Sequence, residues 1–109
     1  MVTAEVIERA MLLISINRTA YPGYVQQDIR EFEDAVRLGT LTERTVDKLI
    51  YSIYSCLLGR EELKAVTPRE LCPEEHDKKT DNALIELFNL LIPYQSAEQL
   101  NSNIIRRTF

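Results

Sequence analysis

The sequence predicts an all-α fold, a compact bundle of four to five short helices. Hydrophobic residues recur at helical spacing in several segments. Capping residues flank these segments, and the chain has only three Gly and four Pro, too few for a turn-rich β-sandwich. At 109 residues, 45% of them hydrophobic, residues 1–109 are expected to form one helical domain. Such a domain buries about two-thirds of its unfolded surface without needing disulfides or metals.

The first helix is expected at about residues 4–17. Thr3 is a suitable N-cap, and Glu5 lies near the positive end of the helix dipole. Most of the apolar residues follow one face of this helix, but Leu12 and Ile16 widen that face. We therefore expect the helix to be central in the bundle or to be partly covered by a second molecule.

Two further helices are expected between residues 25 and 59. Tyr21-Pro22-Gly23-Tyr24 predicts a turn, and the helix that follows, over about 25–38, has Gly39 as its C-terminal cap. The next helix has Thr42 as N-cap and is expected to end at Gly59. We expect it to be the central packing helix, because it repeats apolar residues at helical spacing: Val46, Leu49, Ile50, Ile53, Tyr54, Leu57 and Leu58.

The C-terminal half predicts two more helices after a charged stretch at 60–82. Thr67-Pro68-Arg69-Glu70 predicts a short helical turn, and Pro73 precedes another possible helix start. A fourth helix is expected to end before Pro93, and its apolar face contains Leu84, Leu87, Phe88 and Leu91. Ser96 with Gln99 resembles a capping box that opens a fifth helix, which contains Leu100, Ile104 and Ile105.

The residues that carry chemistry form no recognisable catalytic or metal site. Cys72 and His76 are four residues apart, but zinc sites usually show two clean ligand pairs. We therefore expect a solvated histidine. Cys56 lies in an apolar stretch and is expected to be a small buried side chain. A Cys–His nucleophile would need an oxyanion hole, which the sequence does not supply. We expect no enzymatic activity, no cofactor and no metal.

The net charge and the length of the longest apolar run restrict the partners and the location of the protein. The net charge of −4 disfavours non-specific binding to nucleic acid or to anionic membranes. The longest apolar run, at 10–14, is far shorter than the about 20 residues that span a bilayer. Glu5 and Glu8 precede it, where a secretory signal would have Lys or Arg. We expect the protein in the cytoplasm, or in the host cytoplasm if it is viral.

An excess of apolar positions indicates the function. A bundle of this length buries about one apolar stripe per helix, and exposed apolar residues beyond that mark interfaces. We expect a non-enzymatic protein-interaction module, of the adaptor, inhibitor, immunity or assembly-chaperone type. Its apolar helix face would have an acidic rim that favours a basic partner, or it would form a homodimer through the first or fourth helix. The candidate partner-binding residues are Leu12, Ile16, Tyr21, Tyr24, Tyr51, Ile85, Leu90 and Ile92.

Two alternatives remain open. Peripheral helices or the C-terminal tail would cover the extra apolar residues in a self-contained monomer. In a helix-turn-helix regulator, residues 38–41 would be the turn, and the third helix would enter a DNA groove with Arg44 and Lys48. The acidic net charge and the lack of flanking basic residues argue against the second alternative.

Overall fold

Five α-helices and two short 3-10 helices make up the part of the chain that the computed structural model describes. That part is residues 2–66, 74–101 and 109, with the side chains of 74–77 outside the description. No strand occurs in these residues, so the predicted all-α class is confirmed. The elements are α1 (Ala4–Ile16), η1 (Arg18–Ala20), α2 (Gly23–Leu38), α3 (Glu43–Val66), α4 (Glu74–Leu91), η3 (Ile92–Tyr94) and α5 (Ala97–Asn101).

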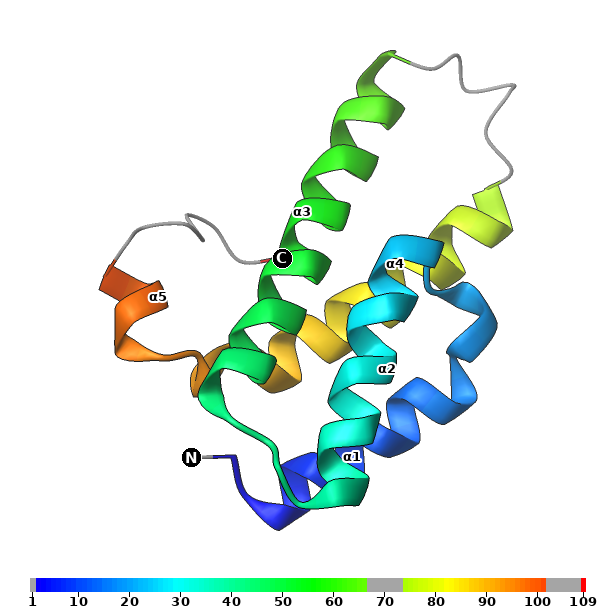
Figure 1. Ribbon diagram of the computed structural model, residues 1–109. Helices are drawn as coiled ribbons and strands as arrows, with labels where there is room; N and C mark the ends of the chain where they lie inside the picture. Colours follow the sequence, from blue (N-terminus) through cyan, green and yellow to red (C-terminus); the bar gives the residue numbers. More distant parts are fainter. Residues whose placement is uncertain (1, 67–73, 102–108) are drawn as a thin grey trace.

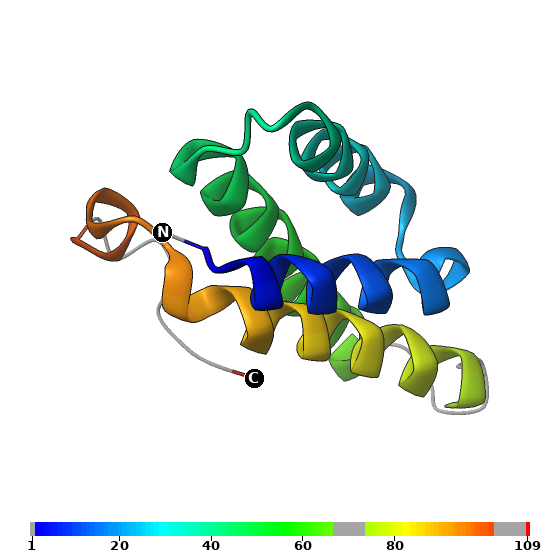
Figure 2. The ribbon, with the colours of Figure 1, turned by 90° about the horizontal axis from the view of Figure 1, so that it is seen from below.

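The helices pack in two pairs. Helix α1 lies along α4, and α2 packs mainly on α3 (Figures 1 and 2). Helix α3 also contacts α4, which joins the two pairs around one core. The last turns of α3 project beyond the other helices at the top of Figure 1.

Three predicted N-caps are confirmed by hydrogen bonds. The Thr3 hydroxyl accepts a hydrogen bond from the Val6 amide at 3.3 Å. The Thr42 hydroxyl accepts one from Thr45 at 3.4 Å, and Ser96 Oγ accepts one from the Gln99 amide at 3.1 Å. Each cap satisfies an amide that has no partner inside its own helix. The sequence therefore determines where α1, α3 and α5 begin.

Helix α3 is the central packing helix, as predicted. Seven of its residues are buried, compared with three in α1 and four in α2. These seven are Val46, Leu49, Ile50, Ile53, Tyr54, Cys56 and Leu57. They meet apolar residues from the other three long helices, including Ile14, Phe32 and Phe88, each 0% exposed. This burial is the dominant favourable contribution to folding.

An aromatic cluster joins α3, α4 and the C-terminal residue. The ring centroids of Tyr54 and Phe88 are 6.1 Å apart, and Phe109 meets each ring edge-on at 5.8 Å. These distances fall in the range in which aromatic pairs attract one another. The cluster therefore holds the C-terminal residue against the core.

The prediction that the third helix ends at Gly59 was wrong. Helix α3 continues to Val66, because an isolated glycine lowers helix stability by only about 1 kcal/mol and does not stop a helix. Gly39, in contrast, does end α2 in the left-handed conformation, with φ 67°. The helix expected to start after Pro73 is the beginning of α4 itself. The predicted helical turn at 67–70 and the residues Ile104 and Ile105 lie outside the described residues.

The two glycines are expected to respond oppositely to alanine. Gly59→Ala should raise the free energy of unfolding by about 0.5–1 kcal/mol, because nothing lies within 4 Å of the added Cβ. Gly39→Ala should lower it by about 1 kcal/mol, because its φ is 67°. Urea unfolding of both variants at low micromolar concentration measures this. Destabilisation by Gly59→Ala would contradict a regular, open helix at this position.

Candidate functional site

Tyr21 is the one predicted anchor that the structure places in the core. Its side chain is 4% exposed, and its hydroxyl donates a hydrogen bond to the Leu13 carbonyl at 3.4 Å. Burial raises the pKa of Tyr21 to about 12. The expectation that Tyr21 anchors an interface is therefore corrected: the η1 turn folds its ring inward, where it closes the core.

The other predicted residues divide into two groups. Ile85, Leu90 and Ile92 are partly buried, because they pack against the core cluster. Leu12 and Ile16 are 49% and 64% exposed. These two are four residues apart on α1, so they share one face. They form a small exposed patch on α1.

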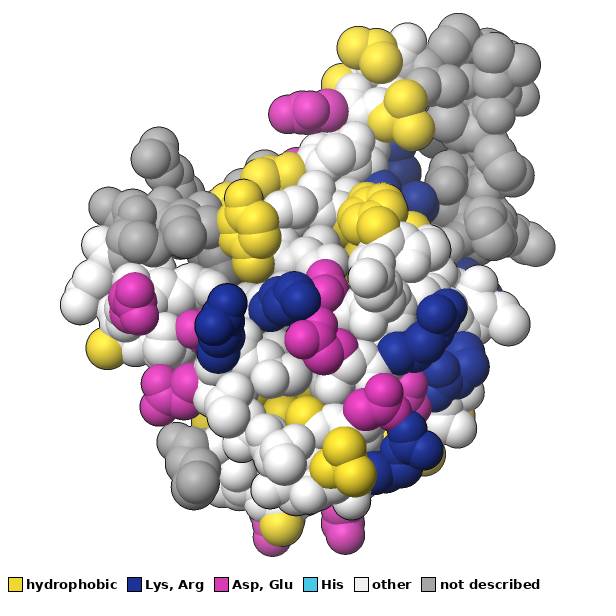
Figure 3. Space-filling model, viewed as in Figure 1, with side chains coloured by type: hydrophobic (Ala, Val, Ile, Leu, Met, Phe, Trp, Pro, Cys, Tyr) yellow, Lys and Arg dark blue, Asp and Glu magenta, His cyan; other side chains and the backbone are white. Residues whose placement is uncertain are grey.

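Tyr24 and Tyr51 lie on a larger surface over α2 and α3. They are 60% and 48% exposed. Figure 3 shows hydrophobic side chains on both sides of a white strip, with neither hydrophobic nor charged side chains, along the upper part of α3. We define the α3 outer face by six exposed residues of α3 at helical spacing: Lys48, Tyr51, Ser55, Gly59, Glu62 and Val66.

Tyr24 interacts with the buried thiol of Cys56 although the residue is largely exposed. Burial of the hydroxyl, together with its hydrogen bond with Cys56, raises the pKa of Tyr24 to about 12. Cys56 itself is 1% exposed and free, as predicted. Burial also raises the pKa of the thiol, which disfavours the reactive thiolate. Tyr24 of α2 therefore lies beside Cys56 of α3.

Two exposed apolar residues of this surface were missed by the sequence prediction. Leu63 and Val66 are 63% and 79% exposed, and both lie beyond Gly59, where the helix was expected to end. The spacing of Tyr51, Ser55, Gly59 and Leu63, every fourth residue, would have indicated a continuous helical face. Interpreting Gly59 as a cap removed this signal.

Ion pairs fix the projecting end of α3 to α4. Arg60 donates a hydrogen bond to Asp81 at 2.6 Å, and Lys64 donates to the second oxygen of the same carboxylate. Burial alone would raise the pKa of Asp81, but the bonds from Lys64 and Arg60 outweigh burial and lower it. Asp81 therefore holds α3 in place beyond Gly59.

Loss of this carboxylate should be destabilising in a pH-dependent manner. Asp81→Asn is expected to lower the free energy of unfolding by about 1–3 kcal/mol at pH 7. Because the pKa of Asp81 is lowered in the folded state, its contribution is present above about pH 3.9 and is lost as the pH falls below that value. Urea unfolding at pH 7 and pH 3 measures the difference.

The matched control is Asp34→Asn, whose exposed pair with Arg37 should contribute less than about 0.5 kcal/mol. Equal losses at both pH values would contradict this role.

The acidic side chains of α2 do not form a free acidic rim. Glu33 pairs with Arg18 at 2.5 Å, and Asp34 pairs with Arg37. On the side that faces α3, Lys48 lies 2.7 Å from Glu31 and also pairs with Asp28. The negative charges of these four side chains are therefore balanced locally.

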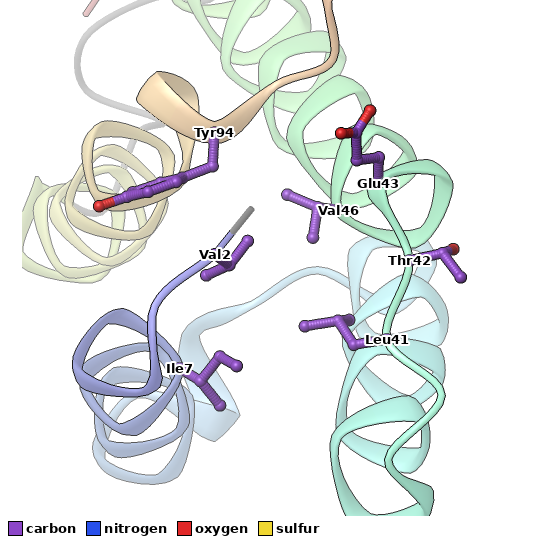
Figure 4. Close-up of a pocket in the computed structure, with 7 residues that line it drawn as sticks. All are labelled: Val2, Ile7, Leu41, Thr42, Glu43, Val46 and Tyr94. Carbon is purple, nitrogen blue, oxygen red and sulfur yellow. The ribbon is translucent and has the colours of Figure 1, made fainter.

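A small apolar pocket opens at the end of the bundle. Its volume is about 250 Å³, and the residues that line it come from the start of α1, the α2–α3 connection, the start of α3 and η3 (Figure 4): Val2, Ile7, Leu41, Thr42, Glu43, Val46 and Tyr94. Small-molecule sites usually have about 300–1,000 Å³. The pocket is therefore better matched to a single apolar side chain than to a cofactor.

The described residues contain no cluster of potential metal ligands. No group of three or more His, Cys, Asp or Glu side chains there could hold a metal ion, while Cys72 and the His76 side chain lie outside the description. None of the described helices combines the length and the apolarity of a membrane span. Comparison with known proteins finds no match, either to a protein family or to a curated protein or solved structure.

Proposed function

We propose that the protein is a non-enzymatic interaction module that binds a protein partner through the α3 outer face. It would act in the cytoplasm, as an adaptor, inhibitor, immunity protein or assembly chaperone does. The observation that carries the proposal is the exposure of Tyr51 and Val66 on this face, with Tyr24 and Leu63 beside it. Tyrosines at the centre of an apolar patch are typical anchors of protein interfaces.

The shape of this surface supports the proposal. Two small residues, Ser55 and Gly59, follow Tyr51 at intervals of four residues along α3 and are exposed, so a helix of a partner can approach the α3 backbone closely here. Neither residue carries a side chain large enough to block that approach. The ion pairs of Asp81 hold the end of α3 against α4. Binding to this surface would therefore cost little reorganisation.

Capture from an extract of the native cells tests the proposal. The tagged chain should retain a protein in stoichiometric amount, and Tyr24→Glu with Tyr51→Glu should abolish that retention. Leu38→Glu is the matched control, because Leu38 is 75% exposed but lies at the end of α2, away from this face. Identical capture by all variants would contradict the proposal, as would a chain that neither captures a protein nor associates with itself.

A helix-turn-helix regulator is the second candidate from the sequence. It would need Arg44 and Lys48 to contact DNA, but Lys48 is already paired with Glu31 and Asp28. Salt-dependent binding to duplex DNA, lost on Arg44→Ala, would favour this alternative. No feature of the described surface favours it over protein binding.

A further inference from the structure

The α3 outer face has a sequence pattern that complements its own reverse. Tyr51 and Gly59 lie four residues before and after Ser55, and Lys48 and Glu62 lie seven residues before and after it. All five of these residues are exposed. If two copies of α3 run antiparallel with Ser55 opposite Ser55, each tyrosine faces a glycine and each lysine faces a glutamate. Offsets of four and seven residues keep all these positions on one helix face.

The charges at the ends of this pattern are complementary between copies. Arg44 and Glu62 have no ion-pair partner among the residues that the structure describes. The hydrogen bond that Lys48 donates to Glu31 raises the pKa of Lys48, whereas the nearby charge of Arg44 lowers it. A glutamate from a second copy, placed between Lys48 and Arg44, would pair with Arg44, because Lys48 already has partners in its own copy. Such complementary charges set the register and orientation of helix pairs.

We infer that the α3 outer face binds the same face of a second copy of the chain, antiparallel, with a twofold axis beside Ser55. In this arrangement the Tyr51 ring packs over Gly59 of the second copy, where no side chain opposes it. Glu62 meets Arg44 of the second copy, beside the Lys48 that already pairs with Glu31 and Asp28 of its own copy, and the reverse contacts are the same by symmetry. The inference rests on the proposed function, because it names the partner of the surface proposed there.

Exposed apolar residues lie on this face and beside it. Tyr51 and Val66 of the α3 outer face are 48% and 79% exposed, and Tyr24 and Leu63 beside it are 60% and 63% exposed. At about 150–250 Å² for a tyrosine side chain, the two tyrosines present roughly 200 Å² per copy. Leu63, Val66 and the polar and small residues of the same face add to this area. A specific interface buries at least about 1,000 Å² over both partners, so the dimer would cover most of these residues.

Disulfide trapping tests both the face and the orientation. In a Cys72→Ser background, Ser55→Cys should form a covalent dimer under mild oxidation, because the two residues meet at the axis. Glu62→Cys is the matched control on the same helix, since in the antiparallel register the two copies of this residue are about 21 Å apart along the helices. Ser15→Cys, exposed on α1, controls for random collision. Each product is resolved by non-reducing gel electrophoresis and mass spectrometry.

The inference predicts a dimer for Ser55→Cys and monomers for Glu62→Cys and Ser15→Cys. Dimers of Glu62→Cys as abundant as those of Ser55→Cys would overturn the antiparallel register. Absence of the Ser55→Cys dimer, with capture of a different protein that still depends on Tyr51, would overturn the inference and leave the proposed function intact. Absence of both the dimer and any Tyr51-dependent capture would overturn the proposed function as well.

Discussion

Phe88→Ala is expected to lower the free energy of unfolding by about 3–5 kcal/mol. Phe88 is 0% exposed, and its ring contacts Tyr54 and Phe109. Alanine would leave a cavity between α3 and α4 and would remove both aromatic contacts. For a domain of this size the expected fall in Tm is about 15–20 °C. Thermal unfolding followed by circular dichroism measures it.

An exposed leucine provides the control for this effect. Leu38→Ala also truncates an apolar side chain to alanine, but at a residue that is 75% exposed, so the free energy of unfolding should change by less than about 0.5 kcal/mol. If Phe88→Ala were as mild as Leu38→Ala, the aromatic cluster would not be part of the core.

Tyr51→Glu is expected to weaken association of the chain about 100-fold, with little effect on folding. Tyr51 is 48% exposed, so its replacement removes an interface anchor without opening the core. In the antiparallel register the new carboxylate also lies near Glu62 of the second copy, and like charges repel. Sedimentation equilibrium over a concentration series measures the dissociation constant, and urea unfolding checks the fold.

Tyr51→Phe separates the ring from the hydroxyl. Phenylalanine keeps the apolar ring that packs over Gly59 of the second copy, so association should change less than about tenfold. Equal loss of association in Tyr51→Phe and Tyr51→Glu would point to the hydroxyl as the important group. Unchanged association in Tyr51→Glu would place the interface elsewhere.

The elements of the fold were predictable because their signals are local. Thr3, Thr42 and Ser96 cap helices where the sequence predicted caps, and Gly39 ends α2 with a positive φ. Side chains spaced three and four residues apart identified the buried face of α3. Capping and helical periodicity each depend on a few neighbouring residues, so a single sequence contains them.

The candidate site was less predictable because it depends on tertiary contacts. The burial of Tyr21 follows from the η1 turn, which directs its ring to the Leu13 carbonyl. The extension of α3 past Gly59 is supported by Arg60 and Lys64, which pair with Asp81, a residue of another helix. Pairings between residues 17 and 21 positions apart leave no local sequence signal. The exposure of Leu63 and Val66 followed from this extension and was therefore missed.

Photo-cross-linking from position 55 tests most directly the claim that a protein covers the α3 outer face. A photoreactive side chain replaces Ser55 in the full chain, and the cells that express it are irradiated. The account predicts one discrete adduct of about 25 kDa, twice the 12.6 kDa of a single chain. Recovery of the uncross-linked chain alone, with no protein attached at this position, would contradict the claim.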